Sequence, residues 1–172
     1  LLHDTDGSWL VKFRHTYDPL DMGMMEYRYN ETARRCGITV PDFKLIDGKY
    51  FATRRFDIEN GVRLHIATAG ALLSESIHTP KSDYKHLLHL TGYLTQDPAQ
   101  VDEMFRRMVF NILTDNKDDH AKNFSFICKE GCWQLAPAYD LTLCSNGYNG
   151  EHATSANNQG KPDIEDMLAV GE

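Results

Sequence analysis

Apolar residues recur at spacings of three and four between residues 98 and 114, the pattern of one face of an α-helix. Asp97 stands where it can cap the first turn, and Pro98 suits the first helical position. The pattern therefore predicts a helix over 98–114 that buries one stripe of side chains against a core. The residues of that stripe are Val101, Met104, Phe105, Met108, Val109, Ile112 and Leu113.

The region before this helix carries shorter patterns, which are separated by residues that favour turns. We expect, in chain order, the second strand of a hairpin at 9–13, a helix at 22–36 that ends at Gly37, strands at 38–46 and 50–56 joined by an Asp47-Gly48 turn, and short helices at 64–78 and 82–90 on either side of Pro80. The chain thus begins rich in strands.

The region after the helix opens with a very polar segment, residues 115–123, which read Asp-Asn-Lys-Asp-Asp-His-Ala-Lys-Asn. Two short strands follow at 124–128 and 132–135, joined by a Lys-Glu-Gly turn. The Asn- and Gly-rich stretch 145–160 predicts a long loop. The later half is therefore expected to combine helices, one hairpin and long loops.

Composition narrows the class of protein. The 172 residues suffice for one domain with a core, or for two lobes that share one. A formal net charge of −7 argues against direct binding to nucleic acid, and no apolar run or signal-peptide pattern indicates a membrane. The four cysteines match neither a disulfide framework nor a zinc site, which favours a cytoplasmic setting. Because the chain starts Leu1-Leu2, we expect it to be part of a longer protein.

The polar segment 115–123 is the strongest functional signal. A predicted buried helix delivers it, and the hairpin then returns the chain to the same edge, where Asp140 follows. Asp118, Asn123 and Asp140 would therefore converge on one divalent cation. Carboxylate and amide oxygens of this kind suit Mg²⁺ that is also bound by substrate phosphates.

The spacing of Asp118 and Asn123 matches the Asp-x-x-x-x-Asn loop of phosphoryl-transfer enzymes. In such a loop the aspartate accepts the proton of the substrate hydroxyl, the asparagine holds a metal, and a later aspartate holds the metal that bridges the phosphates. The same chemistry requires a strand lysine paired with a helix glutamate. Lys12 fits the first role, and Glu26 fits the second, with Glu31 as the alternative if the helix is turned differently.

These residues resemble those of the HipA-like serine/threonine kinases, the toxin components of bacterial toxin–antitoxin modules. The resemblance extends over nearly the whole chain, and its most specific part is the Asp-x-His-Ala-Lys-Asn segment. The segments that carry it are Leu10-Val11-Lys12-Phe13, Glu26-Tyr27, Cys36-Gly37-Ile38, Val40-Pro41, Arg55-Phe56-Asp57, 118–126, and Pro137-Ala138-Tyr139-Asp140-Leu141.

The resemblance implies an α+β, protein-kinase-like fold of two lobes. Residues 1–57 would be part of the N-lobe, with the crossing between lobes at 52–57, and residues 58–172 would be part of the C-lobe. ATP and Mg²⁺ are the implied cofactors. The implied roles are Asp118 as catalytic base, Asn123 and Asp140 as Mg²⁺ ligands, Lys12 on the phosphates with Glu26 as its partner, Phe56 and Asp57 at the adenine and ribose end, and His120 as a support near the phosphates.

The resemblance also implies partners. Family members phosphorylate Ser or Thr hydroxyls of proteins, aminoacyl-tRNA synthetases among them, which leads to growth arrest and persistence. Many are neutralised by a DNA-binding antitoxin of the HipB type. The glycine-rich loop and N-terminal subdomain of the family would lie before Leu1 or on a separate chain, and the last helices after Glu172, so we expect an incomplete kinase core.

Two other classes of function stay open. One is a metal-dependent hydrolase that uses Asp118, Asp119 and Asp140 with His120 as a ligand, and that has no need of Lys12. The other is a non-catalytic fragment that binds a partner through the same fold.

Overall fold

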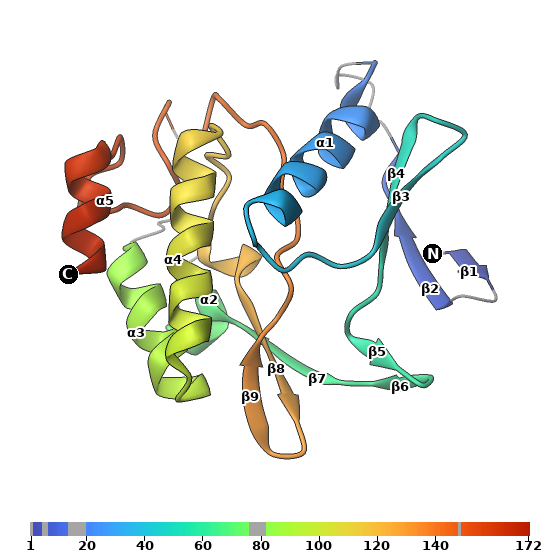
Figure 1. Cartoon of the computed structure of the whole chain (residues 1–172), viewed down its shortest axis with the longest axis horizontal. Helices are drawn as coiled ribbons and strands as arrows, with labels where there is room; N and C mark the ends of the chain where they lie inside the picture. Colours follow the sequence, from blue (N-terminus) through green and yellow to red (C-terminus); the bar gives the residue numbers. More distant parts are fainter. Residues whose placement is uncertain (1, 5–6, 14–19, 76–81, 148) are drawn as a thin grey trace.

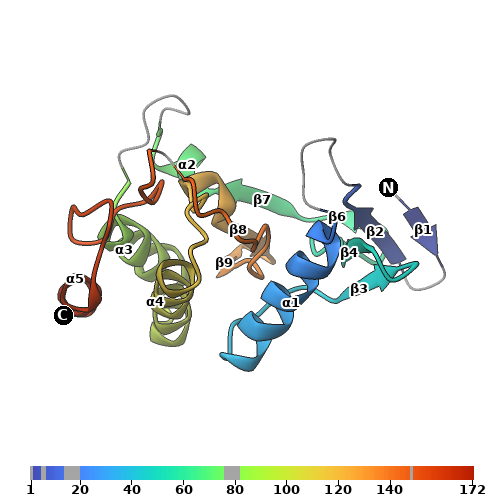
Figure 2. The same cartoon turned by 90° about the horizontal axis from the view of Figure 1, so that it is seen from above.

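The structure is a computed structural model, which describes residues 2–4, 7–13, 20–75, 82–147 and 149–172 (Figure 1). Strands dominate its first part and helices its second part. In Figure 2 the first sheet and the helices α3 to α5 lie at opposite ends of the molecule, with the β8–β9 hairpin between them. Within the described residues, no helix has the length and apolar character needed to cross a membrane.

The first part is a four-stranded antiparallel sheet in the order β1-β2-β4-β3. Its strands are β1 (Leu2–Asp4), β2 (Gly7–Val11), β3 (Phe43–Ile46) and β4 (Tyr50–Arg54). The expected turn joins β3 to β4, with left-handed φ angles of 51° at Asp47 and 68° at Gly48. The hairpin prediction for the start of the chain is confirmed over β1 and β2, and Lys12 follows directly after β2.

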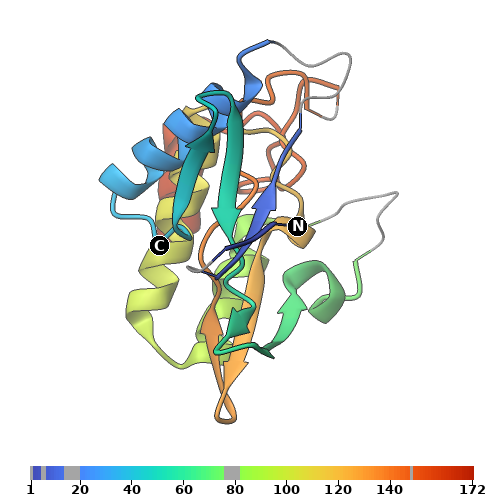
Figure 3. The same cartoon turned by 90° about the vertical axis from the view of Figure 1, so that its right-hand side faces the viewer.

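Helix α1 (Met22–Arg35) lies along one face of the β3–β4 hairpin (Figure 3). Its close approach depends on Gly23, because a Cβ at this position would lie 2.0 Å from the carbonyl oxygen of Lys49. The helix ends as predicted, with Gly37 in the left-handed conformation at φ 77°. This packing sets the position of α1, and therefore of Glu26, relative to the sheet.

The strand predicted over 38–46 is wrong in its first half. Ile38 closes the end of α1 through its N–H, which donates to Ala33 O at 3.0 Å, and its side chain packs into a buried cluster. That cluster consists of Ala33, Ile38, Phe110, Ala138 and Leu141. Pro41 has no N–H to give to a ladder, so the strand starts only at Phe43.

The second sheet is antiparallel in the order β7-β8-β9, and a short β5–β6 hairpin precedes it. The bounds are β5 (Ile58–Glu59), β6 (Val62–Arg63), β7 (His65–Thr68), β8 (Ser125–Lys129) and β9 (Cys132–Leu135). The β8–β9 hairpin confirms the prediction for 124–135. Residue 57, our expected boundary between lobes, lies between β4 and β5, and that boundary stays a prediction.

The helix predicted over 64–78 is wrong for its first five residues, 64–68. His65–Thr68 is strand β7, because β8 offers a pairing partner along its whole length, from His65 opposite Cys128 to Thr68 opposite Ser125. Only α2 (Ala69–Leu72) is helical, with the Thr68 side chain as its N-cap. Residues 76–78 of this prediction lie outside the described residues.

Three helices form the other end of the molecule, namely α3 (Tyr84–Thr95), α4 (Pro98–Leu113) and α5 (Ile164–Gly171). Helix α4 confirms the strongest sequence prediction, and the Asp97 side chain accepts a hydrogen bond from Ala99 N at 3.0 Å. Helix α3 runs further than predicted, to Thr95. No sequence pattern predicted α5, whose Met167 and Val170 join the main core with Leu87, Met104, Met108 and Phe126.

Candidate functional site

Three charged residues from separate elements meet at the end of β2. The ammonium of Lys12 lies 3.1 Å from Glu26 Oε1 and 2.5 Å from Asp140 Oδ1. The backbone N–H of Lys12 continues the β2–β4 pairing by donating to Phe51 O at 2.9 Å. Lys12 therefore contacts its expected partner, Glu26 on α1, and also Asp140, the expected metal ligand in the loop after β9.

Electrostatics keep this lysine charged. Burial by itself lowers the pKa of Lys12, but the charges of Asp140 and Glu26 outweigh it, so the pKa is raised above its ordinary value. Glu26 is buried on the inner face of α1. Glu31, the alternative partner, lies elsewhere on the helix, and its half-exposed side chain pairs with Arg35 at 3.1 Å. The structure thus places Glu26, and not Glu31, beside Lys12.

Asp140 has a constrained backbone. Its φ of 59° is in the left-handed region, which non-glycine residues rarely adopt and which often occurs at functional sites. Both neighbours are held. Leu141 is buried in the cluster beneath α1, and the Tyr139 hydroxyl lies 2.6 Å from Ser125 Oγ and 2.6 Å from Lys122 O. These contacts fix the chain so that the Asp140 carboxylate is directed at Lys12.

The polar segment 115–123 forms a loop that ends in a turn of 3-10 helix, η1 (Ala121–Asn123). The side-chain amide of Asn123 donates to Asp118 O at 2.7 Å. His120 Nε2 lies 3.7 Å from Asp118 Oδ1. Asn123 and Asp140 line the same small pocket. Since the side-chain nitrogen of Asn123 is used within the loop, its Oδ1 is the atom suited to a cation. Together with the Asp140 carboxylate, this oxygen matches the preference of Mg²⁺ for oxygen ligands.

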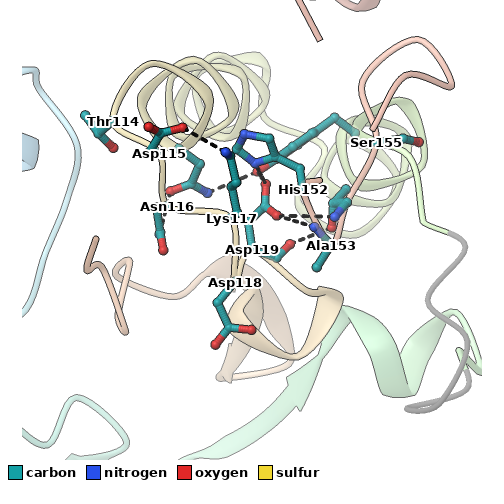
Figure 4. A network of polar contacts seen from close by, with 12 residues as sticks. Thr114, Asp115, Asn116, Lys117, Asp118, Asp119, His152, Ala153 and Ser155 are labelled. Atoms are coloured by element: carbon teal, nitrogen blue, oxygen red, sulfur yellow. Dashed lines mark hydrogen bonds and ion pairs between the residues drawn. The ribbon is translucent and has the colours of Figure 1, made fainter. Parts of the chain in front are cut away.

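The two neighbouring aspartates of this loop lie in opposite environments (Figure 4). The Asp118 side chain is 56% exposed, whereas that of Asp119 is 0% exposed. The Asp119 carboxylate accepts hydrogen bonds from Tyr84 Oη at 2.7 Å and from Ala153 N at 2.9 Å. It is therefore occupied by donors of the protein itself.

This arrangement contradicts the metal cluster expected for a hydrolase. Asp119 turns into the core while Asp118 turns outward, so they do not combine with Asp140 and His120 as ligands. Among the residues that the structure describes, no group of three or more His, Cys, Asp or Glu side chains is placed to hold a metal ion. The Asn123–Asp140 pair remains as the candidate site for a cation.

The two residues expected at the adenine and ribose end have different neighbours. The Phe56 ring centroid lies 5.5 Å from that of Tyr139. The Asp57 carboxylate is held by the guanidinium of Arg55, and the hydrogen bond from Arg55 lowers the pKa of Asp57 below its ordinary value. Phe56 therefore contacts the residue next to Asp140, whereas Asp57 is engaged by its neighbour.

Several residues that shape the site had no sequence signal. Tyr84 and Asn111 come from α3 and α4, and His152 comes from a stretch predicted only as loop. Their importance depends on contacts across 27 to 35 positions of the chain. Tyr139 was detectable only as a neighbour of Asp140.

Comparison with known proteins identifies a family whose sequence pattern this chain matches. The family model of the HipA-like C-terminal domain matches residues 2–170. A putative kinase of Sinorhizobium fredii, Y4dM, is 29% identical over a 172-residue alignment that covers 89% of this chain and 41% of the relative. The chain therefore spans less than half the length of that relative.

Two solved structures share the fold. The HipA of Shewanella oneidensis MR-1, in a complex of HipA, HipB and operator DNA, is 21% identical with a TM-score of 0.77, over 96% of this chain and 46% of that one. The proinflammatory kinase CtkA of Helicobacter pylori is 19% identical with a TM-score of 0.57, over 77% of this chain and 50% of that one. These similarities confirm the predicted α+β, kinase-like fold.

Proposed function

Because this chain belongs to the family of HipA-like C-terminal domains, we propose that it is the core of an ATP- and Mg²⁺-dependent serine/threonine kinase. The observation that carries the proposal is the position of the Lys12 ammonium between Glu26 and Asp140. Kinases need a lysine–glutamate ion pair and a metal-binding aspartate in place together. A site built for hydrolysis alone would have no use for the Lys12–Glu26 pair.

Each residue has a role in this proposal. Lys12 stays protonated and neutralises charge on the nucleotide phosphates, while Glu26 keeps its ammonium in place. Asp118, exposed in the middle of the loop 115–123, orients the acceptor hydroxyl and takes its proton. Mg²⁺, when held by Asn123 and Asp140, would supply positive charge to the phosphates.

The remaining residues would serve the nucleotide and the loop. Phe56, whose ring lies beside that of Tyr139, would offer an apolar surface to the adenine ring, and Asp57 would belong to the ribose end. His120, next to the Asp118 carboxylate, would support the phosphates rather than act as a base.

We propose partners on the same basis. The acceptor would be a Ser or Thr hydroxyl of a cytoplasmic protein, such as an aminoacyl-tRNA synthetase. Its phosphorylation would lead to growth arrest of the cell. A HipB-like, DNA-binding antitoxin would be the regulatory partner. The support for this partner is the structural neighbour from Shewanella oneidensis, which was solved with HipB and operator DNA.

The test is phosphate transfer by Asp118→Asn. This variant keeps the size of the side chain but cannot take a proton, so we expect Mg·ATP binding close to the parent value and transfer reduced about 1,000-fold. Transfer of the labelled γ-phosphate to the proteins of a bacterial extract measures the second effect. Asp115→Asn is the matched control, since Asp115 belongs to the same loop, is similarly exposed and pairs with Lys117 at 3.3 Å. Transfer at the parent rate by Asp118→Asn, or an equal loss in Asp115→Asn, would contradict the proposal.

A further inference from the structure

A buried carboxylate stands directly beside the proposed catalytic base. The Asp119 side chain is completely buried, and four donors of the protein surround it. Oδ1 accepts from Ala153 N at 2.9 Å and from Thr154 N at 3.3 Å, while Oδ2 lies 2.7 Å from Tyr84 Oη and 3.0 Å from His152 Nδ1. A carboxylate in such a place is stabilised only if its oxygens are all hydrogen-bonded, as these are.

The donors around Asp119 are suited to an ionised carboxylate. Burial, together with the charge of Asp119, raises the pKa of Tyr84 well above its ordinary value, so the phenol keeps its proton and donates it. An ionised carboxylate only accepts, so His152 Nδ1 carries the ring proton that lies between the two. Asn111 extends the network by donating to Tyr84 Oη at 3.0 Å.

These contacts tie the loop 115–123 to two distant parts of the chain. Tyr84 is the first residue of α3, and residues 152–154 form a strap that runs along the loop. The strap also bonds the loop backbone, because Ala153 N lies 3.1 Å from Lys117 O and Thr154 Oγ1 donates to Asp119 O at 2.5 Å. The loop is thus held at Asp119 through both its side chain and its main chain.

The anchor determines where Asp118 points. Asp118 and Asp119 are adjacent, and their side chains leave the chain on opposite sides (Figure 4). With Asp119 fixed in the core, the Asp118 carboxylate is turned outward, and the Asn123 amide holds the Asp118 carbonyl at 2.7 Å from the other side. A backbone rotation that carried the Asp118 side chain to another side of the loop would break the buried contacts of Asp119.

We propose, resting on the function proposed above, that Asp119 is a positioning residue that anchors the loop through Tyr84 and the strap 152–154 and so keeps the Asp118 carboxylate facing the acceptor hydroxyl. It touches no reacting atom. Its effect is therefore expected on the rate of transfer and not on the affinity for nucleotide.

The test compares Asp119→Asn with Asp83→Asn. Asparagine at 119 keeps the shape and one acceptor oxygen but turns an NH₂ group toward Tyr84 and His152. Asp83 is the matched control because it is also buried and accepts from Ser155 Oγ and Asn158 N, each at 2.7 Å, but does not contact the loop. Transfer from Mg·ATP to casein gives kcat and KM, and hydrogen exchange of the amides of 117–123 reports on the loop directly.

For Asp119→Asn we expect kcat to fall about 100-fold, as for a catalytic group displaced by about 1 Å, with KM for ATP unchanged. The loop amides should exchange about tenfold faster, the effect of losing one hydrogen bond to a charged group. Asp83→Asn should change neither. The proposal would be overturned if Asp119→Asn had the same kcat and the same exchange rates as the parent. It would also be overturned if kcat fell equally in Asp83→Asn.

A second pair of variants keeps the test valid if Asp119→Asn does not fold. His152→Leu removes the donor and should lower kcat about tenfold, whereas His152→Asn places an N–H near the position of Nδ1 and should restore it. Equal activity of the two would overturn the proposal. If the parent transfers no phosphate, the proposed function fails, and hydrogen exchange then decides on the anchor alone: faster exchange confined to the loop supports it, and unchanged exchange overturns it.

Discussion

Replacing Glu26 by glutamine tests the ion pair on which the nucleotide site is built. The substitution keeps the shape of the side chain and removes one of the two negative charges beside the Lys12 ammonium. Of the two charged partners, Lys12 would keep only Asp140, the same carboxylate that is expected to bind Mg²⁺. We therefore expect Lys12 to be displaced from the phosphates when the metal engages Asp140.

The structure bounds the size of the effect. A hydrogen bond to a charged group contributes about 1.5–3 kcal/mol when it is sheltered from water. The Lys12 side chain is one-third exposed, so solvent screens the pair and the lower value applies, about 1.5 kcal/mol. This corresponds to an affinity for Mg·ATP that is about tenfold weaker.

Titration with a fluorescent ATP analogue in the presence of Mg²⁺ measures this affinity. Glu31→Gln is the control, because Glu31 lies on the same helix and pairs only with Arg35 among the contacts described for it. The parent and Glu31→Gln should bind alike. If Glu26→Gln also binds like the parent, or if Glu31→Gln weakens binding as much, the assignment of Glu26 is refuted.

Three further predictions concern stability. Gly23→Ala would place a Cβ 2.0 Å from Lys49 O and 3.0 Å from Phe51 N, and should lower the free energy of unfolding measured in calorimetric melts by about 1–3 kcal/mol. Gly92→Ala, whose new Cβ would lie 3.5 Å from Val101, should be neutral or stabilising. Equal melting of the two variants would contradict this prediction. The pKa of Lys12 is raised above 10.5, so its ion pairs stabilise the fold fully below that pH and lose this effect as the pH rises through the folded-state pKa. The difference in Tm between the parent and Lys12→Met should therefore shrink only above about pH 10.5. A difference that shrinks between pH 7 and 9 would refute this prediction. Tyr139→Phe leaves Lys122 O and Ser125 Oγ without the hydroxyl 2.6 Å from each, and should lower the free energy of unfolding in urea by about 1–2 kcal/mol, whereas an unchanged value would show that these bonds contribute nothing.

Local patterns were sufficient where a segment's own residues decide its structure. Helix α4 combines an unbroken apolar stripe with a capping aspartate and a proline at its start, and it forms as predicted. The Asp47-Gly48 turn needs only two left-handed residues, and it too forms as predicted. The family resemblance likewise depended on residue types at fixed spacings, and the match over residues 2–170 confirms it.

Tertiary context decided the rest. His65–Thr68 is a strand because β8 pairs with it, which no pattern within 64–78 could indicate. The first half of 38–46 is drawn into a cluster with Phe110 and Ala138, residues far along the chain. Lys12, Glu26 and Asp140 could be proposed as neighbours because known phosphoryl-transfer sites share their order, whereas the anchoring of Asp119 by His152 depends on an approach across 33 positions of the chain.

The most direct test of the central claim is a calorimetric titration of ATP into this chain, with and without Mg²⁺, and with Asp140→Ala in parallel. Loss of Asp140 removes both the proposed metal ligand and one partner of Lys12. We predict binding that requires Mg²⁺ and disappears in Asp140→Ala. Binding that is indifferent to Mg²⁺ and to Asp140, or no binding by the parent, would contradict the claim.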